Sequence, residues 1–155
     1  MMQDVVENRI YFRPSGEFIQ QLTRWLRPRD ISIPIGDSII QKVVDGSNNI
    51  IFLTGQSTGK KRLRNAIKRA LSQADRVAPD YNIGTATMMI LHINTSKVHD
   101  LAMDELKYLM FVFERIEHST MQIHWGVSTS DEWMDDRLRV RMVVRDLGRR
   151  YKHLK

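Results

Sequence analysis

The chain has 155 residues, of which 42 % are hydrophobic and 27 % are charged, the proportions of an ordinary soluble globular protein. This length suits one domain with a substantial core rather than two. The chain has no cysteine, which excludes disulfides and thiolate zinc sites and agrees with a cytoplasmic location. Lys and Arg outnumber Asp and Glu by 24 to 18, giving a formal net charge of +6. This excess indicates an acidic partner, or else a basic surface that is simply solvated.

The N-terminal residues lack the basic start and the apolar core of a signal peptide. No apolar run in the sequence approaches the roughly 20 residues that a membrane-spanning helix needs. We therefore expect neither a secretory leader nor a membrane span.

The first 36 residues contain one short amphipathic segment, EFIQQLTRWL (17–26), flanked by the turn-forming sequences RPSG and RPRD. Its apolar residues recur at helical spacing: Phe18, Ile19, Leu22, Trp25 and Leu26. We expect this helix to fold back and cover an apolar surface, in its own chain or in a partner. A second short helix is predicted from Asp37, an N-cap residue type, to a stop at Gly46.

From Asn48 onwards, strand and helix patterns follow one another regularly. Four apolar runs predict strands, at 48–55, 85–94, 121–127 and 136–145. Two amphipathic segments predict helices, at 60–73 and 101–117. The order strand, helix, strand, helix, strand, strand predicts an α/β (α+β) fold, a four-stranded mixed sheet with both helices on one face. Arginines alternate with apolar residues in the last strand, which predicts that the other face is partly exposed.

The loop GQSTGKK (55–61) lies between the first of these strands and the first of these helices, where a phosphate-binding loop would lie. A Walker loop has one more residue between its glycines and has Ser or Thr after its lysine to hold magnesium. Here Lys61 follows Lys60, and no later strand ends in an Asp placed to hold the metal. We therefore predict a structural turn made by Gly55 and Gly59, with no nucleotide bound and no cofactor.

Three segments together share the pattern of one known family. LTGQSTGKKRLRNAIKRAL (53–71) has a strand, a glycine turn and a helix, and MMILHINTSKVHDLAMDELKYLMFVFE (88–114) has a strand ending in Asn-Thr before a second helix. IHWGVSTSDEWMDDRLRVRMVV (123–144) has an apolar strand, an acidic loop and the sequence DRLRV before the last strand. In these features residues 37–147 resemble the C-terminal domain of FtsZ, the bacterial tubulin-like division protein.

The resemblance implies an N-terminal extension at 1–36 that packs on the domain, an FtsZ C-terminal-like domain at 37–147 and a basic tail at 148–155. An FtsZ also carries a GTPase domain before this one, but only 36 residues precede Asp37 and they contain one glycine. The acidic motif that activates hydrolysis in the family is missing from ISIPIGDSII (31–40). The resemblance therefore implies a stand-alone, non-enzymatic relative of the assembly domain.

Basic side chains are the best candidates for a functional surface. We define the basic face as the outer side chains of the first predicted long helix and its start, Lys60, Lys61, Arg64, Lys68 and Arg69. A second candidate surface for an anion or a partner is the arginine stripe of the last strand, Arg139, Arg141 and Arg145. The resemblance suggests that the basic face binds a protein. The candidate partners are FtsZ, another acidic division or cytoskeletal protein, and a second copy of the chain.

Two other functions stay open. Chorismate-mutase-like trimers have the same layout and grip a carboxylate with arginines, so Arg139 and Arg141 could serve an oligomer or enzyme that binds an anionic metabolite. Nucleic-acid binding is less favoured, because Tyr151 is the one clear aromatic residue among the basic ones. We interpret His92 and His124 as surface or interface residues, since their strands offer no acidic third ligand for a metal.

Overall fold

The computed structural model describes residues 10–12, 17–26, 30–33, 35–45, 47–116 and 121–149. Its helices are α1 (Glu17–Leu26), α2 (Asp37–Val44), α3 (Arg62–Val77) and α4 (Met103–Ile116), with a short 3-10 helix, η1 (Ile83–Thr85). Its strands are β1 (Ile10–Phe12), β2 (Asp30–Ile33), β3 (Asn49–Ser57), β4 (Tyr81–Asn82), β5 (Met88–Ser96), β6 (Gln122–Ser130), β7 (Leu138–Arg145) and β8 (Gly148–Arg149).

The predicted fold class is confirmed, and the sheet is wider than predicted. Six strands pair in the order β1-β3-β7-β5-β6-β2, in which β5 and β6 are parallel and the other neighbours are antiparallel. The four inner strands are the four that the sequence predicts. The two edge strands come from the first 36 residues, and their three and four residues are too short for a recognisable alternation. A separate two-stranded sheet pairs β4 with β8.

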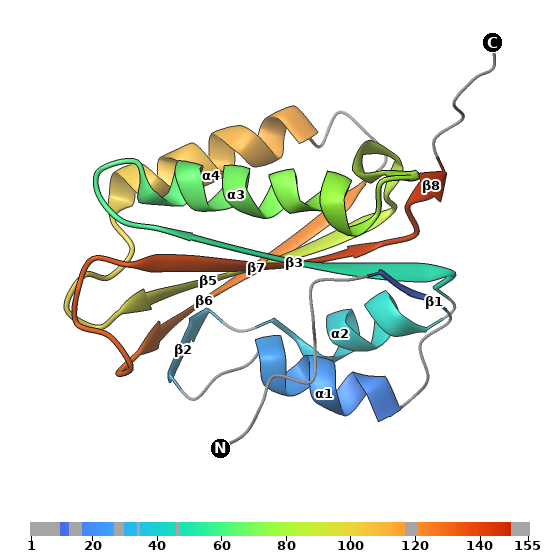
Figure 1. The fold of residues 1–155 in the computed structure, drawn as a ribbon. Coiled ribbons are helices and arrows are strands. Elements are labelled where there is room, and N and C mark those ends of the chain that lie inside the picture. Colours follow the sequence, from blue (N-terminus) through green and yellow to red (C-terminus); the bar gives the residue numbers. More distant parts are fainter. Residues whose placement is uncertain are drawn as a thin grey trace, which may run out of the picture.

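Helices cover both faces of the sheet. The helices α3 and α4 lie on one face, as predicted, and α1 and α2 lie on the opposite face (Figure 1). Leu22 of α1 is completely buried there, in a cluster with Phe52 of β3 and Val143 of β7. The prediction of a partly exposed second face is therefore wrong for this central region of the sheet.

Alternation along β3 distributes its apolar side chains between two cores. Ile51 and Leu53 point into the core beneath α3 and α4, whereas Ile50 and Phe52 point into the core beneath α1 and α2. All nine residues of β5 are buried, as expected for a central strand covered on both faces. Leu22 is the α1 residue described in this core. The structure does not describe the side chains of the other four apolar residues predicted for this helix, Phe18, Ile19, Trp25 and Leu26.

The two glycines of GQSTGKK have different structural roles. A Cβ added to Gly55 would lie 2.2 Å from the Ala66 carbonyl oxygen and 2.6 Å from the Ala70 nitrogen, so α3 rests directly on the β3 backbone. Gly59 has a φ of +89° in the turn that follows β3, a conformation that other residues adopt at a cost. The predicted structural turn is present, and its first glycine serves helix packing.

The proposed division of the chain remains a prediction, because the structure describes only parts of 1–36 and of 148–155. Gly148 and Arg149 form β8, so the first residues of the basic tail pair with β4. Residues 150–155, including Tyr151, lie outside the described residues.

Candidate interaction site

One arginine, Arg62, donates hydrogen bonds to two of the loops at one end of the sheet. Arg62, at the start of α3, is 6 % exposed, and all five of its N–H groups donate hydrogen bonds. Its Nε and Nη2 form a two-pronged ion pair with Glu105 of α4, at 2.8 and 2.9 Å. Its Nη1 and Nη2 also donate to the carbonyl oxygens of His99, Asp136 and Asp100, at 3.0, 2.9 and 3.0 Å.

This ion pair holds both partners in their charged forms. The hydrogen bonds that Arg62 donates to Glu105 raise the pKa of Arg62 against the effect of burial. Burial acts to raise the pKa of Glu105, but the hydrogen bond from Arg62, the Ala102 N–H and the Arg62 charge together lower it. Arg62 therefore fixes three segments against each other: the turn from β3 to α3, the loop from β5 to α4 and the loop from β6 to β7. We call these segments, residues 58–61, 97–102 and 131–137, the loop end.

A backbone N–H of the GQSTGKK loop donates a hydrogen bond to a carboxylate of the same chain. The Gly59 N–H donates to Asp136 Oδ2 at 3.0 Å, which links the loop to the β6–β7 connection. A backbone N–H that would face a phosphate in a nucleotide-binding loop is thus already hydrogen-bonded. This contact fits the expectation that the loop is structural.

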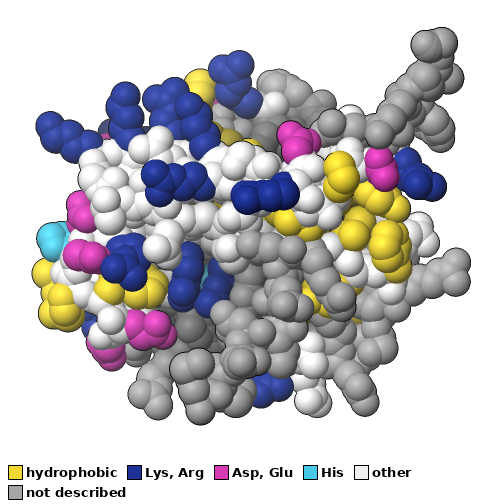
Figure 2. Space-filling model, viewed as in Figure 1, with side chains coloured by type: hydrophobic (Ala, Val, Ile, Leu, Met, Phe, Trp, Pro, Cys, Tyr) yellow, Lys and Arg dark blue, Asp and Glu magenta, His cyan; other side chains and the backbone are white. Residues whose placement is uncertain are grey.

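The basic face is exposed and adjoins the loop end, with which it shares Lys60 and Lys61. Figure 2 shows Lys and Arg side chains gathered over the α3 side of the molecule. Lys60 and Lys61 precede the helix, with Lys61 at its N-cap position, and Arg64 and Lys68 follow on the outer surface. None of these four residues makes an ion pair within the described part of the chain. Arg69 differs, because its Nη1 donates to the Gln56 carbonyl oxygen at 2.7 Å.

Apolar side chains are exposed on or directly beside the loop end. Val98, in the β5–α4 loop, is 60 % exposed, Met103, at the start of α4, is 69 % exposed, and Met134, in the β6–β7 loop, is 67 % exposed. Trp133 is buried nearby, and its Nε1 donates to the Arg137 carbonyl oxygen at 3.2 Å. Exposed apolar tips on well-fixed loops are typical of surfaces that bind other proteins.

The arginine stripe lies on the same sheet face as α1 and α2 and is half-buried. The Arg139 guanidinium stacks over the Trp133 ring at 5.0 Å. Arg145 pairs with Asp146, from Nε to Oδ2 at 2.9 Å, and its Nη1 donates to the Lys42 carbonyl oxygen. Arg141 lies opposite His92 in the β5–β7 register. The stripe and the basic face are therefore separate features, on opposite faces of the sheet.

His92 is buried, so the interpretation of this residue as a surface histidine is wrong. It is 1 % exposed, and neither ring nitrogen has a hydrogen-bond partner in the described structure. Burial, together with the charges of Arg141 and Arg139, lowers the pKa of His92 to about 3. Burial and the nearby Lys42 also lower the pKa of His124. His92 is therefore neutral at physiological pH.

The side chains of the basic face are exposed, as the helical pattern predicts, but the sequence gives Arg62 no role of its own. Arg62 falls within the run KKRLR, but it is not among the residues predicted for the basic face, and the sequence assigns it no partner. Its position provides the missing signal, because Arg62 lies four residues before Ala66, on the buried side of the helix. A cation in line with the apolar face needs a buried partner, and that partner is Glu105.

Within the described residues, no group of three or more His, Asp or Glu could hold a metal ion, and no helix is long and apolar enough to cross a membrane.

Comparisons with known proteins bear on the fold. The sequence matches no protein-family model and no curated protein at a significant level. Solved structures are similar. The empty FtsZ dimer of M. jannaschii superposes with a TM-score of 0.62 and 21 % identity, and the match covers 84 % of this chain and 39 % of the FtsZ chain. The W319Y mutant of the same FtsZ has a TM-score of 0.61 and 22 % identity, over 79 % of this chain and 35 % of the FtsZ chain.

A third structure comes from a different filament protein. GDP-form protofilaments of Bacillus thuringiensis serovar israelensis TubZ give a TM-score of 0.56 and 12 % identity, over 78 % of this chain and 33 % of the TubZ chain. The chain thus spans well under half the length of each of these proteins. Its order of strands and helices and these superpositions agree with the resemblance drawn from the sequence. The chain has an FtsZ/tubulin-like fold.

Proposed function

We propose that this chain is a non-enzymatic protein-interaction module that assembles with itself or with an acidic cytoskeletal protein such as FtsZ, through the basic face. One observation carries the proposal: Lys60, Lys61, Arg64 and Lys68 are exposed cations without an ion-pair partner in the described part of the chain. Positive charges at i and i+4 on a helix repel each other, so they do not stabilise the fold by themselves. An opposing acidic surface would relieve that repulsion.

The neighbouring loop end suits a protein partner better than a small ion. Val98, Met103 and Met134 add apolar area beside the cations, and Arg62 fixes the loops that carry Val98 and Met134. An interface that combines an apolar centre with charged surroundings gains affinity from the first and orientation from the second. Because the loops are already fixed, little conformational entropy would be lost on binding.

The fold neighbours support assembly as the general role. One of the similar FtsZ structures is described as a dimer, and the TubZ structure as protofilaments. This chain spans only 39 % or less of those proteins, so their activities are not transferred to it. The non-enzymatic part of the proposal is supported by the Lys60–Lys61 sequence and by the Asp136 carboxylate at the Gly59 N–H.

The salt dependence of association tests this proposal. Self-association is measured by sedimentation velocity, and binding to FtsZ by co-sedimentation with FtsZ filaments, from 0.05 to 0.5 M salt. Exposed charges are screened beyond a few ångströms at the higher concentration. We expect at least one of the two associations to occur at low salt and to weaken steeply as salt rises. Association that is absent, or that does not change with salt, would refute a role for the basic face.

One observation favours the alternative function, an anion-binding site at Arg139 and Arg141. The neighbouring His92, Asn94 and Ser128 are buried, and each has a polar atom without a hydrogen-bond partner in the described structure. A small polar ligand could satisfy such atoms. A thermal-shift screen with anionic metabolites tests this: stabilisation that is lost in Arg139→Gln and Arg141→Gln would favour the ligand site over the assembly module.

A further inference from the structure

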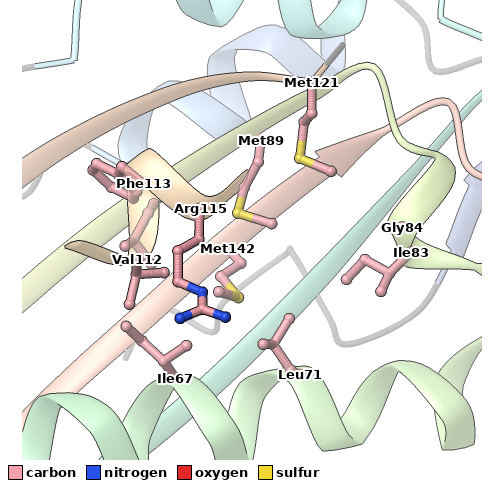
Figure 3. A pocket seen from close by; sticks show the side chains of 11 residues that line it. Ile67, Leu71, Ile83, Gly84, Met89, Val112, Phe113, Arg115, Met121 and Met142 are labelled. Carbon is pink, nitrogen blue, oxygen red and sulfur yellow. The ribbon is translucent and has the colours of Figure 1, made fainter. Parts of the chain in front are cut away.

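A largely apolar cavity of 340 Å³ lies between α3 and α4, above the sheet (Figure 3). Ile67 and Leu71 line it from α3, and Met89 and Met142 line it from the strands beneath. Its volume falls within the range of cavities that hold small organic ligands. This cavity lies apart from the loop end and from the basic face.

The cavity follows from how each helix is held. Gly55 brings α3 into backbone contact with β3, and the alanines on the buried side of α3 keep it there. The helix α4 lies on the same face of the sheet, above β6, where the Phe113 ring centroid lies 6.3 Å from that of Trp125. The strands between them, β7 and β5, are covered at this point by Met142 and Met89. Methionine side chains are flexible and polarizable, so they adapt to an apolar guest.

Among the described residues that line the cavity, the charged one is Arg115. Arg115, near the end of α4, is exposed and makes no ion pair within the described part of the chain. Figure 3 shows its side chain directed toward α3, with the guanidinium lying between Met142 and Ile67. The guanidinium lies 5.4 Å from the centroid of the Phe111 ring, which positions it beside apolar surface. A planar cation with free N–H groups is well suited to bind a carboxylate in two-pronged geometry.

We propose that this cavity binds a small amphipathic anion, with a medium-length alkyl chain among the methionines and a carboxylate at Arg115. The alkyl chain of the ligand would contribute affinity because it leaves water, and the carboxylate would contribute affinity by its hydrogen bonds with the Arg115 guanidinium. This site does not depend on the proposed assembly function, since none of its lining residues belongs to the basic face or the loop end.

Binding of decanoate, measured by titration calorimetry below its aggregation concentration, tests whether the Arg115 charge binds the carboxylate. Decanol and decyltrimethylammonium serve as probes with the same chain but no anionic head. We expect decanoate to bind more tightly than either, and Arg115→Gln to weaken decanoate on the order of tenfold while leaving decanol unchanged. Arg115→Lys should retain much of the preference for decanoate, and Arg76→Gln, at an exposed arginine of the last turn of α3, is the matched control.

Methyl NMR of the methionines tests the location. Decanoate should shift the methyl signals of Met89, Met121 and Met142, which line the cavity, and leave those of the exposed Met103 and Met134 unchanged. Failure to bind decanoate, equal affinities for wild type and Arg115→Gln, or shifts confined to Met103 and Met134 would each overturn the proposal. None of these results would affect the salt-dependent association expected of the basic face.

Discussion

At the scale of single residues, two arginines of the first turn of α3 have opposite environments. Arg62 is buried, and all of its donors are used by Glu105 and by carbonyl oxygens of two loops. Arg64, two residues later, is exposed and has no ion-pair partner in the described structure. One arginine therefore builds the loop end, and the other is available to a partner.

We predict a large difference in stability between substitutions at these two positions. Arg62→Leu leaves Glu105, whose side chain is 11 % exposed, without its counterion and should lower the free energy of unfolding by about 3 kcal/mol. Arg62→Lys should recover part of that loss, because an ammonium cannot reproduce the forked geometry. Arg64→Leu, the matched control, should change stability by less than about 0.5 kcal/mol. Urea unfolding checks these values, and equal effects of Arg62→Leu and Arg64→Leu would mean that the ion pair does not fix the loops.

The buried His92 predicts a dependence of stability on pH. The unfolded chain binds a proton at this histidine below pH 6.5, whereas the folded chain does so only near pH 3. Between those values the unfolded state holds more protons, so the free energy of unfolding should rise with pH by up to ~1.4 kcal/mol per unit. Above pH 7 this contribution should be constant.

Unfolding measured between pH 4.5 and 7.5 checks this prediction. In His92→Gln the slope should become smaller, with a remainder from His124, whose pKa is also lowered. A slope that is the same in His92→Gln and the wild type would show that His92 titrates normally in the folded protein.

At the scale of elements, the position of α3 depends on Gly55. Because the atoms nearest to its missing Cβ belong to the helix backbone, a side chain there cannot be accommodated by a rotamer change. Gly59 is different, since a Cβ there would meet nothing within 4 Å and the constraint is its positive φ alone.

We therefore predict that Gly55→Ala destabilises the protein more than Gly59→Ala does. Displacing α3 should cost about 3 kcal/mol, and a left-handed alanine about 1–2 kcal/mol. Chemical denaturation compares the two, and amide NMR shifts should spread along α3 in Gly55→Ala but stay near the turn in Gly59→Ala. If Gly59→Ala proved the more damaging, the close contact of α3 with β3 would be in doubt.

The sequence predicts the helices α1 to α4, the two short ones included, and the four inner strands, but not the two edge strands. The strands β3, β5, β6 and β7 have eight or nine residues, and α3 and α4 have 16 and 14, enough to show their periods. The strands β1 and β2 could not be predicted in the same way, because three or four residues establish no alternation and their pairing with β3 and β6 is formed over long sequence separations.

At the scale of the whole molecule, the basic face could be predicted and the surroundings of the arginine stripe could not. Three cations of the basic face, Arg64, Lys68 and Arg69, lie on the outer side of α3, and Lys60 and Lys61 directly precede this helix. The helical period therefore predicts that they share a surface. The exposure of Arg139, Arg141 and Arg145 depends instead on α1 and α2, which are brought to that side of the sheet by tertiary packing. The burial of His92 was unpredictable for the same reason.

Binding of a partner at the basic face is tested most directly by two variants of equal net charge. The first reverses three cations of the face, Lys60→Glu, Arg64→Glu and Lys68→Glu. The second reverses three exposed cations elsewhere, Arg24→Glu, Arg76→Glu and Lys107→Glu. Three reversals of two units each take the formal net charge from +6 to 0 in both variants, so only the location of the change differs.

The dissociation constant is measured at low salt for self-association and for binding to FtsZ filaments. Both variants should stay folded, because the apolar side of α3 is untouched in each. We predict that the first variant loses the association of the wild type and that the second retains it to within a few-fold. Retention of wild-type affinity in the first variant, or an equal loss in both, would contradict the account.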